Sequence, residues 1–159
     1  MKKLLFILLL YSLHGYTQKI FEVYNFSTQT VQIVDIVTNA SGTYPEFHSK
    51  SFAIITLAPG DSYILQNTSN PFRFPFDSPT SSPYIANWER LDSPTSSTVM
   101  TSFNAWLIGS NQDFDRMLFA LGGTGYSIGT TNPSLTGSGW NAIYQPSSNP
   151  TTYTIVFFP

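Results

Sequence analysis

Thr30–Thr38 reads T-V-Q-I-V-D-I-V-T, and this stretch decides the fold class. Branched side chains dominate it, and such residues favour strands over helices. Its apolar residues fall on both faces of a period of two: Val31, Ile33 and Val37 on one face, Val34 and Ile36 on the other. We interpret this pattern as a central strand covered on both sides, because a half-exposed strand would carry polar residues on one face.

Two hairpins are predicted around this strand. Ile20–Phe26 mixes aromatic and β-branched residues, and only Ser27-Thr28-Gln29 separates it from Thr30–Thr38, a spacing short enough for a hairpin. Ser51–Leu57 and Ser62–Gln66 flank Ala58-Pro59-Gly60-Asp61, where proline presets the turn and glycine takes the positive φ. We therefore expect each pair of segments to lie side by side in a sheet.

The C-terminal half also indicates strands. Thr98–Ile108 alternates cleanly and predicts one long strand, and Trp140–Tyr144 and Thr152–Phe158 predict the last two. Phe114–Leu121 is apolar but contains helix formers, so whether 113–121 is strand or helix stays open. The segment D-S-P-T-S-S occurs at 77–82 and again at 92–97, and each copy has the composition of a turn.

Together these patterns predict an all-β chain, an antiparallel β-sandwich or jelly roll of roughly eight or nine strands. Residues 1–17 predict a cleaved secretory signal peptide: Lys2 and Lys3 carry charge, Leu4–Leu10 is apolar, and Gly15-Tyr16-Thr17 offers a small-x-small cleavage site. The expected mature chain is therefore a single domain, 18–159, located in the periplasm, on the outer surface or in the medium.

Composition excludes several functions. The chain has no cysteine, which removes disulfides, thiolate metal sites and covalent haem. Charged residues make up 10% of it, against about 25% in typical domains, and they form no basic cluster. Nucleic acid and anionic membrane surfaces are therefore not expected partners. No cofactor, no metal and no membrane span are expected in the mature chain.

Two short motifs resemble catalytic or metal-binding sequences. Gly125-Tyr126-Ser127-Ile128-Gly129 matches the G-x-S-x-G elbow, but no acidic residue follows Asp115 and no histidine follows His48. The elbow needs both partners downstream, so we interpret the match as chance. Glu46 and His48 would share one face of an extended segment, but one histidine is too few for a typical zinc site. A surface histidine beside a surface carboxylate is expected.

Calcium binding stays an open question. Asn111, Asp113 and Asp115 space oxygen ligands by two, as a calcium loop begins. Arg116 stands where an EF-hand needs glycine and Gly122 where it needs glutamate, so an EF-hand is excluded. An irregular calcium site between loops and a solvated turn both remain.

The predicted binding site consists of aromatic and polar residues near one end of the fold. Its members are Tyr84, Asn87, Trp88, Arg90 and Trp140. Exposed rings among polar side chains suit stacking against a sugar or a partner protein, and Trp88 is the best candidate for exposure.

The missing catalytic partners favour a non-catalytic binding or structural module of the cell envelope or surface, which contacts a protein or a glycan. Two alternatives stay open. One is an exported hydrolase acting on glycans through carboxylates, among which Glu22, Glu46 and Glu89 are the mature glutamates. The other is a subunit of a pore or filament that assembles through Thr98–Ile108.

Overall fold

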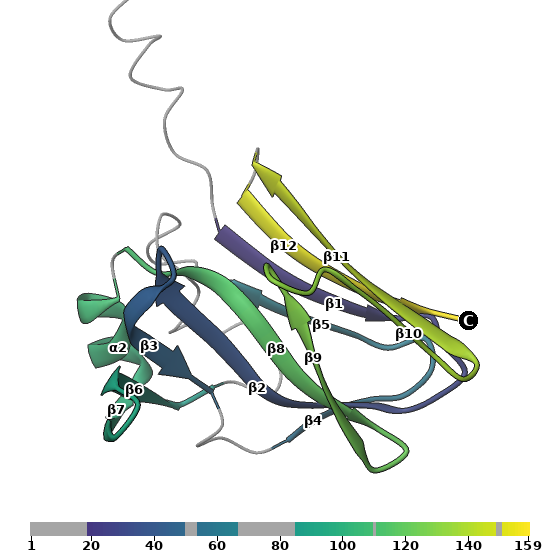
Figure 1. The fold of residues 1–159 in the computed structure, drawn as a ribbon, viewed down its shortest axis with the longest axis horizontal. Coiled ribbons are helices and arrows are strands. Elements are labelled where there is room, and N and C mark those ends of the chain that lie inside the picture. The colour runs from purple at the N-terminus through teal and green to yellow at the C-terminus, as the bar shows by residue number, and fades with distance from the viewer. Residues whose placement is uncertain (1–18, 50–53, 67–84, 110, 149–150) are drawn as a thin grey trace, which may run out of the picture.

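The structure is a computed structural model, and it describes residues 19–49, 54–66, 85–109, 111–148 and 151–159. These residues form strands almost throughout, with one short helix. The strands make two sheets whose facing sides enclose the core (Figure 1). The all-β prediction is confirmed in this coarse form. The described residues contain twelve strands, more than the eight or nine expected.

The first sheet contains both ends of the described chain. It has five strands in the order β10-β11-β12-β1-β5. Their bounds are Lys19–Asn25 (β1), Ser62–Gln66 (β5), Ser134–Gly137 (β10), Trp140–Ser148 (β11) and Thr151–Phe158 (β12). β1 pairs with β12 in parallel, and the other neighbours are antiparallel. The predicted final strands are confirmed as β11 and β12.

The second sheet has seven strands, in the order β7-β6-β3-β2-β8-β9 with β4 also paired to β2. Their bounds are Val31–Ala40 (β2), Thr43–His48 (β3), Ile55–Leu57 (β4), Asn87–Ser93 (β6), Ser96–Thr101 (β7), Asp113–Leu121 (β8) and Thr124–Gly129 (β9). The segment left open at 113–121 is therefore a strand. The second D-S-P-T-S-S copy joins β6 to β7, whereas the copy at 77–82 lies outside the described residues.

Both predicted hairpins are wrong in their pairing. β1 lies in the first sheet and β2 in the second, while β4 pairs with β2 and β5 pairs with β1. The two short connections are corners at which the chain crosses between sheets. Buried Asn25 holds both corners together: its Nδ2 donates to the carbonyls of Gln29 and Leu57, and its own carbonyl accepts from the amide of Gly60.

The predicted long strand Thr98–Ile108 is also wrong in its second half. β7 ends at Thr101, and Ser102–Ile108 forms the helix α2. Thr101 caps the helix, and the hydroxyl of buried Ser102 donates to the carbonyls of Ile85 and Ala86. Ser102 and Ala105 are buried three residues apart, which is the spacing of one helix face. The residues of 98–108 also alternate at a period of two, so the three-residue spacing of the helix could not be recognised in the sequence.

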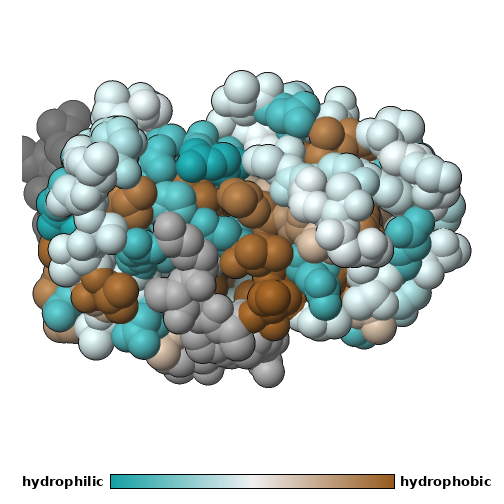
Figure 2. All heavy atoms as spheres, turned by 60° about the horizontal axis from the view of Figure 1, so that its bottom comes forward, coloured by the Kyte–Doolittle hydropathy of each residue, from teal (hydrophilic) through white to brown (hydrophobic). Residues whose placement is uncertain are grey.

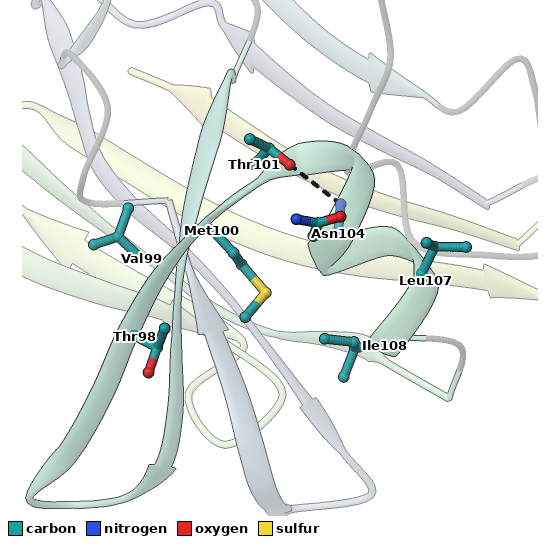
Figure 3. Close-up of a pocket in the computed structure, with 7 residues that line it drawn as sticks. All are labelled: Thr98, Val99, Met100, Thr101, Asn104, Leu107 and Ile108. Carbon is teal, nitrogen blue, oxygen red and sulfur yellow. Dashed lines mark hydrogen bonds between the residues drawn. The ribbon is translucent and has the colours of Figure 1, made fainter.

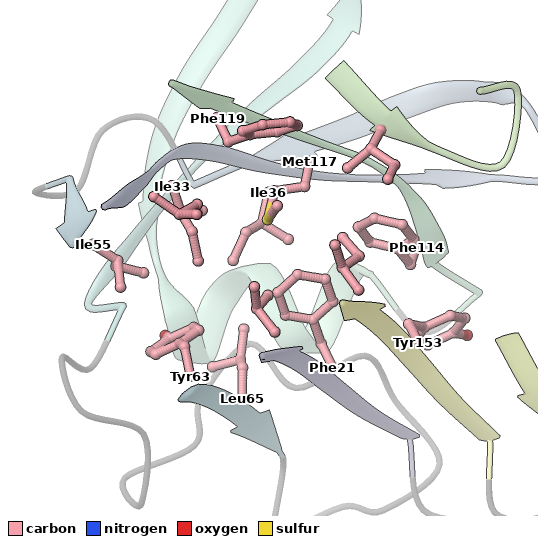
Figure 4. Close-up of a cluster of buried hydrophobic side chains, with 14 of the residues drawn as sticks. Phe21, Ile33, Ile36, Ile55, Tyr63, Leu65, Phe114, Met117, Phe119 and Tyr153 are labelled. Carbon is pink, nitrogen blue, oxygen red and sulfur yellow. The ribbon is translucent and has the colours of Figure 1, made fainter. Parts of the chain in front are cut away.

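The core lies between the two sheets (Figure 4). Phe21 and Leu65 of the first sheet face Ile36 and Met117 of the second, and all four side chains are buried. Aromatic rings fill one end, where Phe114 lies within 5.8 Å of the ring centres of Phe21, Tyr144 and Tyr153. Burial of such rings is the main stabilising contribution in a chain without disulfides.

Candidate functional site

Two features of the described residues merit consideration as functional sites. The first is a network of charged side chains on the second sheet, on the side away from the core. His48 Nδ1 lies 2.7 Å from Asp35 Oδ2, and His48 Nε2 lies 3.0 Å from Glu46 Oε2. Arg116 Nη2 donates to the same Glu46 oxygen at 3.3 Å, and Arg116 Nη1 donates to Asp115. The network thus ties β2, β3 and β8 together.

Two β-bulges place these side chains. The pairing of β2 with β8 skips Val34 on β2 and Asp115 on β8. Each extra residue reverses which positions face the core, so Ile33 and Ile36 both point inward although they are three apart. The same reversal follows Phe114 on β8, where the next core residue is Met117. It leaves Arg116 on the outer side, opposite Val37 of β2. Val37 also lies opposite His48 of β3, so Arg116 and His48 flank the same residue.

The core positions of β2 show the same change of parity. Core positions run Val31, Ile33, then Ile36 on β2, so the apolar pattern moves from odd to even numbers. The interpretation of β2 as a doubly covered strand agrees with the burial of residues 35–39 on both faces, but it does not account for the shift between Ile33 and Ile36. A bulge gives a better account, because β-bulges commonly redirect side chains beside functional or buried polar groups.

His48 is buried, with 7% of its surface exposed, so the predicted surface histidine is wrong. Burial lowers the pKa of His48, but hydrogen bonds to Asp35 and Glu46 and their charges outweigh burial and raise this pKa above its ordinary value of 6.5. The protonated ring then donates from both nitrogens. A general base needs a ring nitrogen that can accept a proton from substrate, and this geometry offers none.

The described residues contain no group of three or more histidine, aspartate or glutamate side chains placed to hold a metal ion. Asp113 accepts hydrogen bonds from Lys19 Nζ at 2.5 Å and from the Tyr153 hydroxyl at 2.7 Å. Asp115 accepts from Arg116 and from the Thr130 hydroxyl. The two carboxylates therefore have separate protein partners rather than a shared centre. Nothing in this arrangement favours the calcium alternative.

The G-x-S-x-G match falls on β9, with no helix after it. Ser127 is exposed and lines a hollow of about 370 Å³ with Val34, Leu118 and Tyr126. Leu118 of β8 lies between Ser127 and Asp35 in the strand register, so the network does not reach this serine. The arrangement lacks the strand-to-helix turn of a nucleophile elbow.

The predicted aromatic site is not assembled as expected. Trp88 is fully buried and Trp140 is 4% exposed, so the expectation that Trp88 is surface-exposed is wrong. Both rings are core residues, and Trp140 packs edge-on against Phe119 and Tyr126. A large ring inside an alternating strand is indistinguishable from a surface ring when only the sequence is known, because both faces of β6 carry polar neighbours.

The remaining predicted site residues are scattered. Asn87 is exposed on β6, and half-buried Arg90 pairs with Asp92 at 2.6 Å. Tyr84 lies outside the described residues. The three glutamates of the hydrolase alternative also separate: Glu22 lies on the first sheet, while Glu46 and Glu89 occupy neighbouring strands of the second.

The second feature is a groove between β7 and α2, which we call the β7–α2 groove (Figure 3). Its volume is about 490 Å³, within the range of small-ligand and peptide sites. It is lined by Thr98, Val99, Met100, Thr101, Asn104, Leu107 and Ile108, none of which is charged. Met100 of β7 and Ile108 of α2 point toward one another across it. Met100 also packs against the core.

The groove lies in a part of the surface where large apolar side chains are exposed. Val99 is 62% exposed, Leu107 49% and Ile108 45%, and all three side chains line this one groove. Figure 2 shows hydrophobic side chains among pale and hydrophilic ones at the left end, where Figure 1 places α2 and the β6–β7 hairpin, and a larger hydrophobic group near the centre of the same face. Contiguous exposed apolar surface of this kind marks interaction sites.

Comparison with protein-family models, with curated proteins and with solved structures finds no match to this chain.

Among the described residues, no helix has the length and apolar character needed to cross a bilayer.

Proposed function

We propose that this chain is an exported, non-catalytic β-sandwich module of the cell envelope or surface that binds another protein through the β7–α2 groove. The observation that carries the proposal is the uncharged, largely apolar lining of this groove, which includes the exposed Val99. The buried centre of a protein–protein interface is more apolar and poorer in charged residues than the rest of the surface. The glycan alternative rested on stacking rings, and the burial of Trp88 and Trp140 weighs against it.

The charged network supports a non-catalytic function. His48 is the only histidine in 18–159, and both of its nitrogens contact carboxylates. Glu46 Oε2 already accepts from His48 and Arg116. The network therefore joins strands rather than presenting a group to substrate.

A carboxylate-dependent hydrolase is the second candidate, because Glu46 and Glu89 share the outer side of neighbouring strands. It predicts hydrolysis on a panel of glycans that Glu89→Gln abolishes, without a change in thermal unfolding. Such a result would replace the non-catalytic proposal.

Export is proposed from the sequence, with cleavage after Thr17. When the full sequence is expressed in a bacterial host, the protein should be found outside the cytoplasm. Its mass, measured by mass spectrometry, should correspond to a chain that starts at Gln18. Protein that remains in the cytoplasm at full length would contradict this proposal.

Binding through the groove is tested with a charge placed in it. The chain is immobilised, envelope proteins are captured and identified, and the affinity of the purified partner is measured for Ile108→Asp and for Val34→Asp. Val34 is a matched control, since it is 40% exposed on the outer side of β2 and lies outside the groove. We expect Ile108→Asp to weaken binding by about tenfold or more, since a buried unpaired charge costs over 1.4 kcal/mol. Equal affinities for the two variants would overturn the proposal.

A further inference from the structure

The β7–α2 groove runs along a sheet edge. Among the described residues, β7 is the last strand on its side of the second sheet, beyond β6. A strand in this position has one row of backbone groups facing away from the sheet. Natural edge strands are commonly protected by charges, prolines or bulges. The sequence of β7, S-S-T-V-M-T, contains neither a charge nor a proline.

The hydrogen bond next to the strand shows which backbone groups face outward. The Ser102 amide donates to the Ala86 carbonyl at 2.9 Å, and this pair continues the register in which Thr101 lies opposite Asn87. In antiparallel strands, hydrogen-bonded and non-hydrogen-bonded pairs alternate. Met100 and Thr98 are therefore bonded to β6, whereas the N–H and C=O groups of Val99 and Ser97 point away from it.

From this alternation we infer that the occupant of the β7–α2 groove is an extended, uncharged peptide segment of the partner, which adds to the second sheet as a further strand beside β7. The inference rests on the proposed function and specifies the partner's chemistry. The segment's backbone pairs with the outward groups of Val99 and Ser97. Every second side chain enters the groove against Met100 and Ile108, which favours apolar residues at alternate positions.

An extended chain can form hydrogen bonds with the outward backbone groups of β7, whereas a helix cannot. A helix already uses its own backbone groups internally, so a helix packed in the groove would strip water from the β7 edge without replacing it. Each backbone group buried in this way without a partner is costly. A strand replaces the water with hydrogen bonds at the spacing that β7 presents.

A displayed library of random peptides, selected on the intact mature chain, tests this inference. We expect the selected peptides to be uncharged, with apolar residues at alternate positions. Their affinities are then measured for Val99→Pro and Val99→Ala. Both variants remove the isopropyl group of Val99, but only proline also removes the outward N–H. Binding to Val99→Pro should be about tenfold weaker than to Val99→Ala, which corresponds to the loss of one hydrogen bond.

A second measurement uses the unaltered protein, in case Val99→Pro fails to fold. Amide hydrogen exchange at Val99 and Ser97 should slow on addition of a selected peptide, while the amides of Thr98 and Met100 are already protected. Unchanged exchange at Val99 and Ser97, or equal affinities for the proline and alanine variants, would overturn strand addition.

The outcomes separate this inference from the proposed function. A partner that is lost with Ile108→Asp but binds Val99→Pro and Val99→Ala equally would leave the groove as the binding site and exclude strand pairing. If neither Ile108→Asp nor Val99→Pro weakens binding, both proposals are rejected. Concentration-dependent dimerisation that Val99→Pro abolishes would show that the occupant is a second copy of this chain, and would overturn a partner protein as its source.

Discussion

His48 shows how single residues in this protein depend on their neighbours. The ring lies between Asp35 on β2 and Glu46 on its own strand, and Arg116 continues the chain of charges to β8. Removing one member of a buried charged group leaves the others uncompensated, which costs more than the group contributes in net stability. The residue therefore acts as a structural connection between strands.

The first prediction concerns pH. Because the folded-state pKa of His48 lies above 6.5, its contribution to the free energy of unfolding is fully present below the unfolded-state pKa. It is lost as the pH rises through the folded-state pKa. Urea unfolding at a series of pH values should show stability falling across this window. His48→Gln should flatten the dependence and lower stability by about 3 kcal/mol at acidic pH. An unchanged pH profile in this variant would contradict the charged network.

The second prediction concerns Gly129, which pairs with Arg116 at the β8 bulge. A Cβ built there would lie 2.1 Å from the Asp115 carbonyl oxygen and 2.6 Å from Arg116 Cα, both backbone atoms. Gly129→Ala should therefore destabilise the protein by about 2 kcal/mol or more, because the bulged backbone must move. Gly125→Ala, on the same strand with nothing within 4 Å, is the matched control. Equal melting temperatures for the two variants would exclude close packing at the bulge.

At the scale of elements, β7 and α2 form a strand and a helix from one alternating stretch. The strand depends on its bonds to β6, and the helix on the cap at Thr101 and on the buried face of Ser102 and Ala105. The capping bond from the Asn104 amide is long, at 3.4 Å, so packing contributes more than the cap to the helix.

The third prediction follows from the alternation on β7. Thr98→Pro removes an amide bonded to β6, whereas Val99→Pro removes one that faces outward. Proline is tolerated in edge strands only at outward positions. Thermal unfolding should show Thr98→Pro to be less stable than Val99→Pro by about 1–2 kcal/mol. The reverse order would mean that the register of the β6–β7 pair differs from the one described.

For the whole molecule, the decisive contact joins the two ends of the described chain. β1 pairs with β12 in parallel from Lys19 opposite Thr151 to Asn25 opposite Phe157. β12 lies inside its sheet, between β11 and β1, and its Ile155 and Phe157 are buried. Such distant contacts form only after much of the chain is ordered, which slows folding.

The fourth prediction tests this closure. Deletion of 151–159 removes an interior strand and three core residues, Tyr153, Ile155 and Phe157, so the shortened chain should lose cooperative unfolding and the near-ultraviolet circular dichroism of packed rings. Deletion of Pro159 alone removes the acceptor of a hydrogen bond from half-buried Asn141, and should change stability by less than about 1 kcal/mol. Cooperative unfolding of the longer deletion would contradict the central place of β12.

The sequence by itself determined that the chain is all-β and where many strands run. β-branched and aromatic residues at a period of two are a local property, and they predicted β1, β2, β11 and β12. The turn at Ala58–Asp61 was also predicted, because proline and glycine set its backbone. The Gly60 φ of 91° agrees with that expectation.

Only the tertiary structure decided which strands pair, which rings are buried and where the charged network lies. A corner between sheets and a hairpin have the same short polar sequence, and Asn25 distinguishes them through bonds to Gln29 and Leu57 that form only on folding. Asp35, Glu46, His48 and Arg116 are brought together by two bulges and by the register of three strands. The position of β7 at a sheet edge was also decided by the tertiary structure, because it depends on the order in which the strands pair.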